Sequence, residues 1–340
     1  MRTSERVVVI GGTGFIGTPL VQALISGGHL VTVVGRHERP VPLGARFIVG
    51  EVADSRRMME VIRGATLVYH LGTGGGKSWT DFIRDFIEGT RNVAEACLHA
   101  GVRRVIYASS IAAVYLGRAS TIMDATPTDD KPNLRSLYSR GKIAAEAELH
   151  RLRLERKLPF VILRPGVVLG KGGILEHSGV GQWPADTRCI GWGSGTNPLP
   201  LVLVDDVVDA LLLAATAAEA EGRAFNIVGD VCLTAREYVA LCARVSFRDY
   251  RFYPRRLAYL QTIEIAKWAL KALARKPENP FPSYRDLKSR SFRSTFDNAE
   301  AKRILGWKPT ADVGVLIDTA MKIHIKPIAP GDLRRLALEQ

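Results

Sequence analysis

The stretch Val7-Val8-Val9-Ile10-Gly11-Gly12-Thr13-Gly14-Phe15-Ile16-Gly17 decides the fold of this 340-residue chain. Four β-branched residues predict a buried strand, and glycines at positions 11, 14 and 17 follow it. Such glycines let the backbone turn tightly and approach a ligand closely, while a helix starting at Gly17 directs free amides and its dipole at an anion. The stretch therefore predicts a strand–turn–helix unit that binds the pyrophosphate of a dinucleotide, with contacts from Gly11, Thr13, Gly14, Phe15, Ile16 and Gly17.

Apolar runs and helix-like stretches alternate over the first two thirds of the chain. The apolar runs lie at residues 7–10, 30–34, 46–49, 67–71, 105–108, 161–163 and 201–204, and the helix-like stretches at 17–26, 55–62, 79–100 and 138–156. Continuous apolar strands joined by crossover helices are typical of a parallel sheet that helices cover on both faces. The predicted fold class is therefore α/β, a doubly wound parallel Rossmann sheet, whose ligands bind beyond the carboxyl ends of the strands.

The periodicity weakens after Ala224, which predicts a smaller C-terminal substrate lobe. There we expect helices at 234–244, 255–274, 298–305 and 313–322, with a Pro-rich basic loop at 276–292. The Gly-rich loop 169–196 holds His177, Trp183 and Trp192, which suits either a substrate lid or simple packing. The predicted domains are a dinucleotide-binding Rossmann domain at 1–166 and 200–228 and a substrate-binding lobe at 167–199 and 229–340.

The composition favours a globular cytoplasmic protein. Hydrophobic residues make up 46% of the chain and charged residues 24%, with no secretory signal and no apolar run long enough to span a bilayer. The four scattered cysteines lack the spacing of metal ligands. Buried, reduced thiols and no metal site are therefore expected at Cys97, Cys189, Cys232 and Cys242.

The net charge of +13 is concentrated towards the C-terminus. Residues 244–308 hold 16 Lys and Arg against 6 Asp and Glu, a net charge of +10. Within them, segment 255–276 combines apolar positions at helical spacing with flanking basic residues. Such a helix lies either on an anionic membrane surface, as a peripheral contact, or against its own lobe. The sequence contains no recognition motif for nucleic acid, so no nucleic-acid partner is expected.

A second motif, Tyr138-Ser139-Arg140-Gly141-Lys142, places a phenol and an ammonium one turn apart on the same face of a helix. A free tyrosine has a pKa of about 10, too high for a base at neutral pH. A neighbouring ammonium, and the positive nicotinamide of an oxidised dinucleotide, favour the phenolate and lower that pKa. Tyr138 can then exchange a proton with a substrate hydroxyl or carbonyl as hydride moves.

The two motifs together resemble the extended branch of the short-chain dehydrogenase/reductase superfamily. This branch includes sugar-nucleotide epimerases and dehydratases, dihydroflavonol reductases and 3β-hydroxysteroid dehydrogenases, and further matches lie at residues 105–110, 163–166, 204–206 and 305–309. The resemblance implies an NAD(P)-dependent oxidoreductase that transfers hydride between nicotinamide and the hydroxyl or carbonyl carbon of a small alcohol, ketone or sugar nucleotide. The alternatives are a nucleotide-sugar epimerase or dehydratase and, from another class, a non-catalytic NAD(P)-binding scaffold or assembly factor.

The resemblance also implies roles for individual residues. Ser110 would hold the substrate oxygen beside Tyr138, and Lys142 would bind the nicotinamide ribose. Ser109 competes with Ser110 for this role, because neighbouring strand residues face opposite ways. Asp54 is expected to cap a helix. Further cofactor contacts are expected from Glu51, Val52, Leu71, Gly72, Thr73, Pro165 and Gly166, in addition to Tyr138 and Lys142.

The end of the second apolar run bears on the choice of cofactor. A carboxylate there binds the 2′-hydroxyl of the adenine ribose, whereas an arginine accommodates a 2′-phosphate. The chain has Gly35-Arg36-His37 and no carboxylate until Glu38, which favours NADP over NAD, with Arg36 on the phosphate. The alternative is that Arg36 stacks on adenine or points into solvent.

Two departures from the family pattern bear on the substrate. Phe86 stands where the epimerase-like pattern often has Asn, and Leu199 stands where sugar-nucleotide enzymes often have an arginine that grips the diphosphate. The lost charge-assisted contact argues against a UDP-sugar held in the usual way. The resemblance further implies a homodimer, formed through helices 79–100 and 138–156 in a four-helix bundle.

Overall fold

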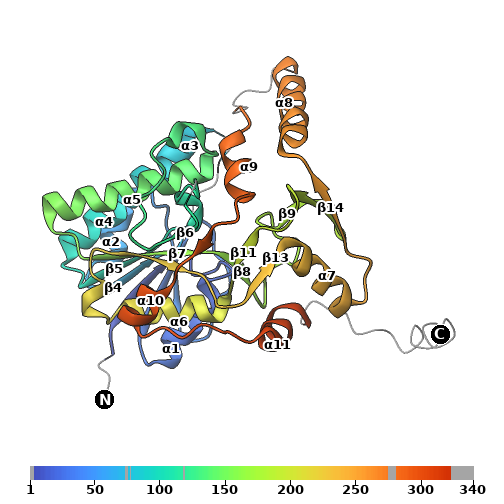
Figure 1. The fold of residues 1–340 in the computed structure, drawn as a ribbon. Coiled ribbons are helices and arrows are strands. Elements are labelled where there is room, and N and C mark those ends of the chain that lie inside the picture. The colour runs from blue at the N-terminus through green and yellow to red at the C-terminus, as the bar shows by residue number, and fades with distance from the viewer. Residues whose placement is uncertain (1–3, 73–75, 77, 118, 275–280, 323–340) are drawn as a thin grey trace.

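The structure of the protein is a computed structural model, and it describes residues 4–72, 76, 78–117, 119–274 and 281–322. Its centre is a seven-stranded sheet in the order β12-β7-β5-β4-β1-β2-β3, in which all neighbouring strands are parallel (Figure 1). The predicted doubly wound fold is confirmed. The strands are β1 (Arg6–Ile10), β2 (Leu30–Gly35), β3 (Arg46–Val49), β4 (Leu67–His70), β5 (Arg104–Ala108), β7 (Phe160–Pro165) and β12 (Ala224–Ile227).

Helices cover both faces of this sheet because its strands are apolar on both sides. One face carries α1 (Gly17–Ser26), α6 (Val204–Ala214) and α10 (Ala299–Leu305), and the other α2 (Ser55–Ile62), α4 (Gly89–Ala100) and α5 (Leu137–Arg156). In β1, Val7 and Val9 join the core of the first face, and Val8 and Ile10 join that of the second. Successive side chains of a strand point to opposite faces, so two covered faces require an unbroken apolar run.

The helix predicted at 79–100 is continuous but has a widened middle. It consists of α3 (Trp79–Phe82), a π-helical stretch η1 (Ile83–Glu88) and α4. A π-helical turn accommodates an additional residue, so the side chains after it are rotated relative to those of an unbroken α-helix. Phe86 in this stretch faces α5, where a Cβ on Gly141 would lie 3.0 Å from its ring.

The assignment of the run 201–204 to the central sheet is wrong. Most of it lies in β11 (Pro198–Leu203), which pairs with β8 (Val167–Leu169) and β13 (Cys232–Thr234) in a separate three-stranded sheet. The seventh strand of the central sheet is β12, which pairs with β7. An apolar run reports burial and not the partner strand, so the sequence alone could not separate the two sheets.

Segments 169–196 and 276–292 contain more regular structure than predicted. β9 (Gly181–Ala185) and β10 (Arg188–Trp192) form a second three-stranded sheet with β14 (Arg251–Arg255). α9 (Tyr284–Arg290) lies in the predicted loop, and the hydroxyl of its N-cap Ser283 accepts a hydrogen bond from the Asp286 amide at 3.0 Å. A helix this short depends on its cap and its contacts, and it leaves no periodic signal in the sequence.

The remaining elements complete the lobe and the loops. The helices predicted there correspond to α7 (Ala235–Ser246), α8 (Leu257–Leu273), and α11 (Val313–Leu316) with η5 (Ile317–Met321). The short elements are β6 (Thr121–Ile122) paired with β15 (Thr295–Phe296), and the single turns η2 (Ile111–Ala113), η3 (Pro132–Leu134) and η4 (Ala218–Ala220). Among the described helices, none combines the length and the apolarity that crossing a bilayer requires.

The cysteines are unpaired, as predicted, but one of them is exposed. Cys97, Cys189 and Cys242 are buried free thiols, whereas Cys232 is exposed because β13 is a three-residue strand at the edge of its sheet. Within the described residues, no group of three or more His, Cys, Asp or Glu side chains is placed to hold a metal ion.

Candidate active site

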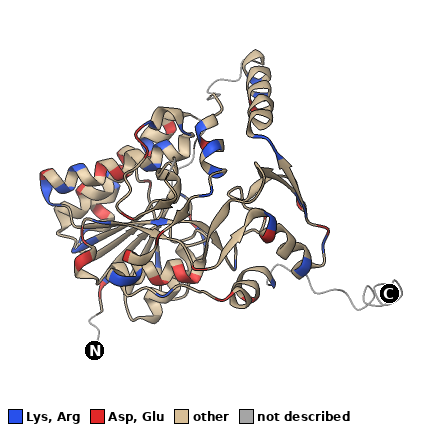
Figure 2. Ribbon diagram, viewed as in Figure 1, with Lys and Arg blue, Asp and Glu red and all other residues tan. Residues whose placement is uncertain are grey.

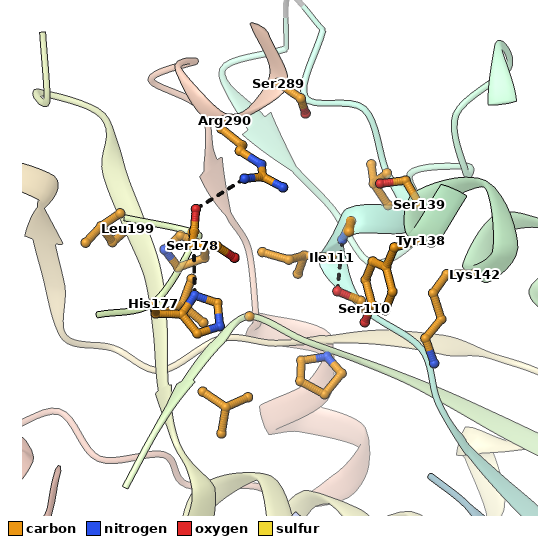
Figure 3. Close-up of a pocket in the computed structure, with 18 of the residues that line it drawn as sticks. Ser110, Ile111, Tyr138, Ser139, Lys142, His177, Ser178, Leu199, Ser289 and Arg290 are labelled. Atoms are coloured by element: carbon orange, nitrogen blue, oxygen red, sulfur yellow. Dashed lines mark hydrogen bonds between the residues drawn. The ribbon is translucent and has the colours of Figure 1, made fainter. Parts of the chain in front are cut away.

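Two adjoining cavities open at the carboxyl ends of the central strands. The smaller, of about 480 Å³, lies around the turn after β1 and reaches the ends of β2 and β3. The larger, of about 790 Å³, extends from the end of β5 into the C-terminal lobe (Figure 3). The two cavities adjoin in one site, because both are lined by Phe15, Ile16, Leu71 and Ala108.

In the turn between β1 and α1, only glycine fits at the two positions where the backbone makes its closest contacts. Gly11 has a φ of +83°, and a Cβ on it would lie 2.6 Å from the backbone nitrogen of Gly72. A Cβ on Gly17 would lie 2.2 Å from the carbonyl oxygen of Gly11. α1 begins at Gly17 without a side-chain cap from Ile16, so no capping side chain occupies its first amides. This backbone cradle fits the pyrophosphate of a dinucleotide.

The far end of the smaller cavity carries the residues predicted to bind the adenosine. Arg36, His37 and Arg39 line it after β2, and Glu51 and Val52 line it after β3. The structure thus brings the predicted positions Arg36, Glu51 and Val52 to the same end of one cavity.

The turn after β3 is fixed by the helices beside it. Asn92 Nδ2 donates hydrogen bonds to the carbonyls of Val52 at 3.0 Å and Ala53 at 3.1 Å. Asp54 accepts a hydrogen bond from the Arg57 amide at 2.9 Å and caps α2, as predicted. A capped helix and an anchored turn hold this wall of the cavity in a defined position.

Ser110, Tyr138 and Lys142 all line the larger cavity (Figure 3). The Ser110 hydroxyl accepts a hydrogen bond from the Ala112 amide at 3.1 Å and lies beside Tyr138. Tyr138 is 41% exposed and lines the cavity. Burial raises the pKa of Tyr138, and the nearby Ser110 side chain only partly opposes this.

Lys142 is 1% exposed and lies one helical turn from Tyr138. Its ammonium donates to the Ala108 carbonyl at 2.5 Å and to the Tyr107 hydroxyl at 3.4 Å. Burial lowers the pKa of Lys142 to about 7, and the nearby Glu146 carboxylate opposes this shift. The sequence predicted that Lys142 and an oxidised nicotinamide together lower the pKa of Tyr138, and this stays a prediction. In the protein alone, burial favours the neutral form of both groups.

The structure separates the two neighbouring serines. The buried Ser109 hydroxyl donates to Glu146 Oε1 at 2.5 Å. Glu146 in turn forms a buried ion pair with Arg164, with 2.6 Å between Arg164 Nη2 and Glu146 Oε2. The Ser109 hydroxyl is therefore engaged in an internal network, whereas that of Ser110 lies next to Tyr138.

A sequence profile described as the NAD dependent epimerase/dehydratase family matches residues 7–228. The match spans the glycine turn, the serine pair and the Tyr-x-x-x-Lys motif, whose residues line the two cavities. The chain belongs to this family. The resemblance inferred from the motifs is therefore confirmed.

Relatives within the family have different activities. The chain is 27% identical to a 2-alkyl-3-oxoalkanoate reductase of Stenotrophomonas maltophilia, over 69% of this chain and 73% of the relative. It is 28% identical to a UDP-glucose 4-epimerase of Mycolicibacterium smegmatis, over 89% of this chain and 93% of the relative. The solved structure of MoeE5 in complex with UDP-glucose and NAD superposes with a TM-score of 0.70 at 24% identity, covering 98% of this chain and 99% of that one. This last likeness shows the shared fold.

Both departures from the family pattern lie close to the larger cavity. The Phe86 ring meets the Tyr138 ring edge-on at 6.2 Å between centroids, and its centroid is 5.6 Å from Lys142 Nζ. Leu199 lines the cavity and packs in the apolar cluster of the lobe. Neither side chain offers a hydrogen-bond donor to a diphosphate.

The other predicted cofactor contacts are divided between the cavities. Leu71 lines both of them, Gly72 lines the smaller one, and Pro165 and Gly166 line the larger one. Thr73 lies outside the described residues.

The structure gives different surroundings to the three aromatic residues singled out in segment 169–196. His177 lines the larger cavity, whereas Trp183 packs edge-on against Tyr250 at 6.0 Å and Trp192 is buried. Packing therefore accounts for both tryptophans.

Arg290, at the end of α9, also lines the larger cavity, although the sequence did not single it out. No spacing relates it to Tyr138, so only the folded chain could reveal their proximity.

Proposed function

We propose that this protein is an NAD(P)-dependent oxidoreductase that transfers hydride between nicotinamide and a hydroxyl or carbonyl carbon of a small substrate. The observation that carries the proposal is that Ser110 and Tyr138 line one cavity, which adjoins the glycine cradle. Lys142 lies one turn along α5 and lines the same cavity. This arrangement supplies a proton donor and acceptor beside the expected path of the hydride.

The residues of the chain have complementary tasks in such a reaction. The bound cofactor would accept or supply the hydride. When an alcohol is oxidised, Tyr138 takes the proton of its hydroxyl, and when a ketone is reduced, Tyr138 returns the proton to the oxygen. Ser110 donates a hydrogen bond to that oxygen and fixes its position. Lys142, when protonated, stabilises the phenolate of Tyr138 and would bind the ribose hydroxyls.

Replacing Tyr138 with Phe tests the proposal. The variant keeps the ring but loses the proton, so we expect kcat/KM to fall about 10²–10⁴-fold while cofactor affinity is unchanged. The measurement is nicotinamide absorbance in a screen of ketones and alcohols with NADPH and NADH. Tyr259→Phe, on the exposed helix α8, is the matched control. Undiminished turnover by Tyr138→Phe would contradict the proposed mechanism.

The same screen distinguishes the alternatives. An epimerase or dehydratase reoxidises its cofactor within each turnover, so a UDP-sugar would react without a net change in nicotinamide absorbance. The 28% identity to a UDP-glucose 4-epimerase supports this alternative, and Leu199 in the cavity opposes it. A non-catalytic scaffold would bind cofactor without turning over any substrate, and Tyr138→Phe would leave its function intact.

The cofactor in this proposal is NADP. Arg36 and Arg39 line the adenosine end of the smaller cavity, where two guanidinium groups would attract a 2′-phosphate. Arg36→Gln is expected to weaken NADPH binding about tenfold, or about 1.4 kcal/mol, and to leave NADH binding unchanged. Fluorescence titration with both cofactors measures this. Equal losses for both cofactors, or tighter binding of NADH by the unaltered protein, would favour NAD.

The proposed assembly is a homodimer in which α4 and α5 of two copies pack as a four-helix bundle. The two helices lie side by side on one outer face (Figure 1), and Leu154 of α5 is 78% exposed. Leu154→Arg is expected to convert a dimer into a monomer in multi-angle light scattering, whereas Leu43→Arg, in an exposed loop, is not. A protein that is monomeric before substitution would exclude this dimer.

The proposed membrane partner is an anionic lipid surface, contacted by α8. This helix extends away from the rest of the lobe (Figure 1), and Leu260 is its one buried residue. Leu270 and Leu273 are 68% and 83% exposed. Arg255 and Arg256 precede the helix, and Figure 2 shows basic residues where β14 leads into it. Exposed apolar side chains with basic flanks are features of helices that lie in the interface of an anionic bilayer.

Vesicle flotation tests the membrane contact. The full chain is expected to float with vesicles that contain phosphatidylglycerol, to float less with phosphatidylcholine alone, and to be released by salt. The pair Leu270→Gln/Leu273→Gln should weaken binding about tenfold, because two apolar side chains leave the bilayer. The control pair Leu43→Gln/Leu134→Gln, exposed elsewhere, should leave binding unchanged. Equal binding by both pairs, or no flotation at all, would contradict the contact.

A further inference from the structure

The larger cavity contains a guanidinium that forms no ion pair with any carboxylate of the described residues. Two other arginines near this cavity are paired: Arg135 and Arg285 both form ion pairs with Asp129, at 2.8 and 2.6 Å. Arg135 is also paired with Asp286. Arg290, the last residue of α9, lines the cavity, and its side chain is exposed.

The nearest carboxylate on the same helix is already occupied. Asp286 accepts from Arg135 with one oxygen and from the Ser136 amide, at 2.9 Å, with the other. Burial lowers the pKa of Arg290, and Asp286 opposes this only partly. Since Asp286 is occupied, an anion in the cavity would give Arg290 a charge-assisted partner.

Two contacts orient the Arg290 side chain, and a third holds its backbone. Its Nη1 donates to the Ser178 carbonyl at 3.2 Å, and its Cζ lies 5.1 Å from the centre of the Trp192 ring. Its own carbonyl accepts a hydrogen bond from Asn197 Nδ2 at 3.1 Å. These contacts reduce the side-chain entropy that binding a ligand would otherwise cost.

His177 adds a second donor beside Arg290. The Gly179 amide donates to His177 Nδ1 at 2.9 Å, so in the neutral ring the proton is on Nε2. Burial, together with the positive charge of Arg290, lowers the pKa of His177 and keeps the ring neutral. The pair therefore presents hydrogen-bond donors to the cavity.

The donor pair lies across the cavity from the proposed catalytic residues. Figure 3 shows Arg290 and His177 on one side and Ser110 and Tyr138 on the other. Ile111 and Leu199 contribute apolar surface to the same cavity. A ligand that reaches both sides would have a polar head at one end and a reacting carbon at the other.

We propose that Arg290 and His177 form an anion site that holds a carboxylate or phosphate group of the substrate while the reacting carbon lies at Tyr138. A guanidinium presents paired N–H donors that match the oxygens of both groups. The substrate class is therefore an acid or phosphate ester with an apolar stretch before its hydroxyl or carbonyl. The position of the reacting carbon rests on the proposed function, whereas the anion site does not.

Three ligands that share one chain and differ in the head group test the site: octanoate, octyl phosphate and octanamide. Calorimetric titration uses full-length protein saturated with NADPH, so that the glycine cradle is already filled. One of the two anions is expected to bind about tenfold or more tightly than the neutral amide, and the tighter one identifies the head group. Arg290→Gln should abolish this preference, and Arg290→Lys should retain part of it. Arg293→Gln, whose arginine donates to Thr196 Oγ1 at 3.0 Å on the exposed surface, should retain it fully.

The outcomes separate the anion site from the proposed function. Equal binding of all three ligands, or the same preference in Arg290→Gln as in the unaltered protein, would overturn the site. Tyr138→Phe should bind the anion normally and lose turnover. If Tyr138→Phe kept its turnover, the oxidoreductase mechanism would fail while the anion-binding result stood.

Discussion

The two halves of the site are built by different means. The cofactor half is centred on a backbone structure, the glycine turn after β1, in which Gly17 packs against the Gly11 carbonyl within one short stretch. The substrate half is assembled from side chains of distant segments, where Arg135, between η3 and α5, meets Asp286 of the C-terminal lobe, 151 residues away. A local backbone structure leaves a sequence motif, and a long-range ion pair leaves none. Substitutions should therefore disturb one half without the other.

The largest expected loss of stability comes from a substitution in the substrate half. Arg135→Met removes a buried guanidinium from Asp129 and Asp286, which should cost about 3–5 kcal/mol of unfolding free energy, since breaking a buried pair leaves an uncompensated charge. Urea unfolding measures the loss, and cofactor titration of the folded fraction should show unchanged affinity. Arg303→Met, which removes an exposed pair with Glu300, is the control and should have little effect. Weakened cofactor binding by Arg135→Met would show that the two halves are not independent.

A pH-dependent effect is expected at Lys142, which lines the larger cavity behind Tyr138. Its pKa is about 7 in the folded chain and about 10.4 in an unfolded one. Between these values the unfolded chain binds more protons, so stability rises with pH, by up to about 1.4 kcal/mol per unit. Lys142→Met should remove this rise in urea unfolding from pH 7 to pH 10. Equal slopes for both proteins would show that Lys142 keeps its charge in the fold.

In the cofactor half, the addition of a single methyl group should weaken cofactor binding. Gly17→Ala places a Cβ 2.2 Å from the Gly11 carbonyl oxygen, so the turn must move. We expect the Kd for NADPH to rise about tenfold, or about 1.4 kcal/mol. Gly28→Ala is the control, because its φ of +82° is also strained but its surroundings are open. The control should lose stability and keep its affinity, and a similar Kd for both variants would disprove the cradle.

The smallest expected effect concerns the cap beside the adenosine end. Asp54→Ala removes the acceptor for the Arg57 amide and should cost about 1 kcal/mol of stability. Thermal unfolding measures this, and Asp54→Asn should recover most of the loss. No change in either variant would show that α2 does not depend on its cap.

The glycine turn and the Tyr138–Lys142 pair could be recognised in the sequence because their determinants are local. The apolar run before Gly11 and the spacing from Tyr138 to Lys142 each reflect one strand or one helix turn. The substrate half depends on how the lobe docks, so Arg290 had no signal in its own neighbourhood. The run 201–204 was placed in the wrong sheet for the same reason. The burial that raises the pKa of Tyr138 in the protein alone was also not visible, because spacing does not report burial.

The four residues that border both cavities impose an order of events. Phe15, Ile16, Leu71 and Ala108 form a shared boundary, so a molecule in the smaller cavity supplies part of the surface that a molecule in the larger one touches. A substrate that bound before the cofactor would lack that contact surface. We therefore expect the cofactor to enter first and leave last. In steady-state kinetics, oxidised and reduced cofactor would then compete for the free protein, whereas substrate and product would not.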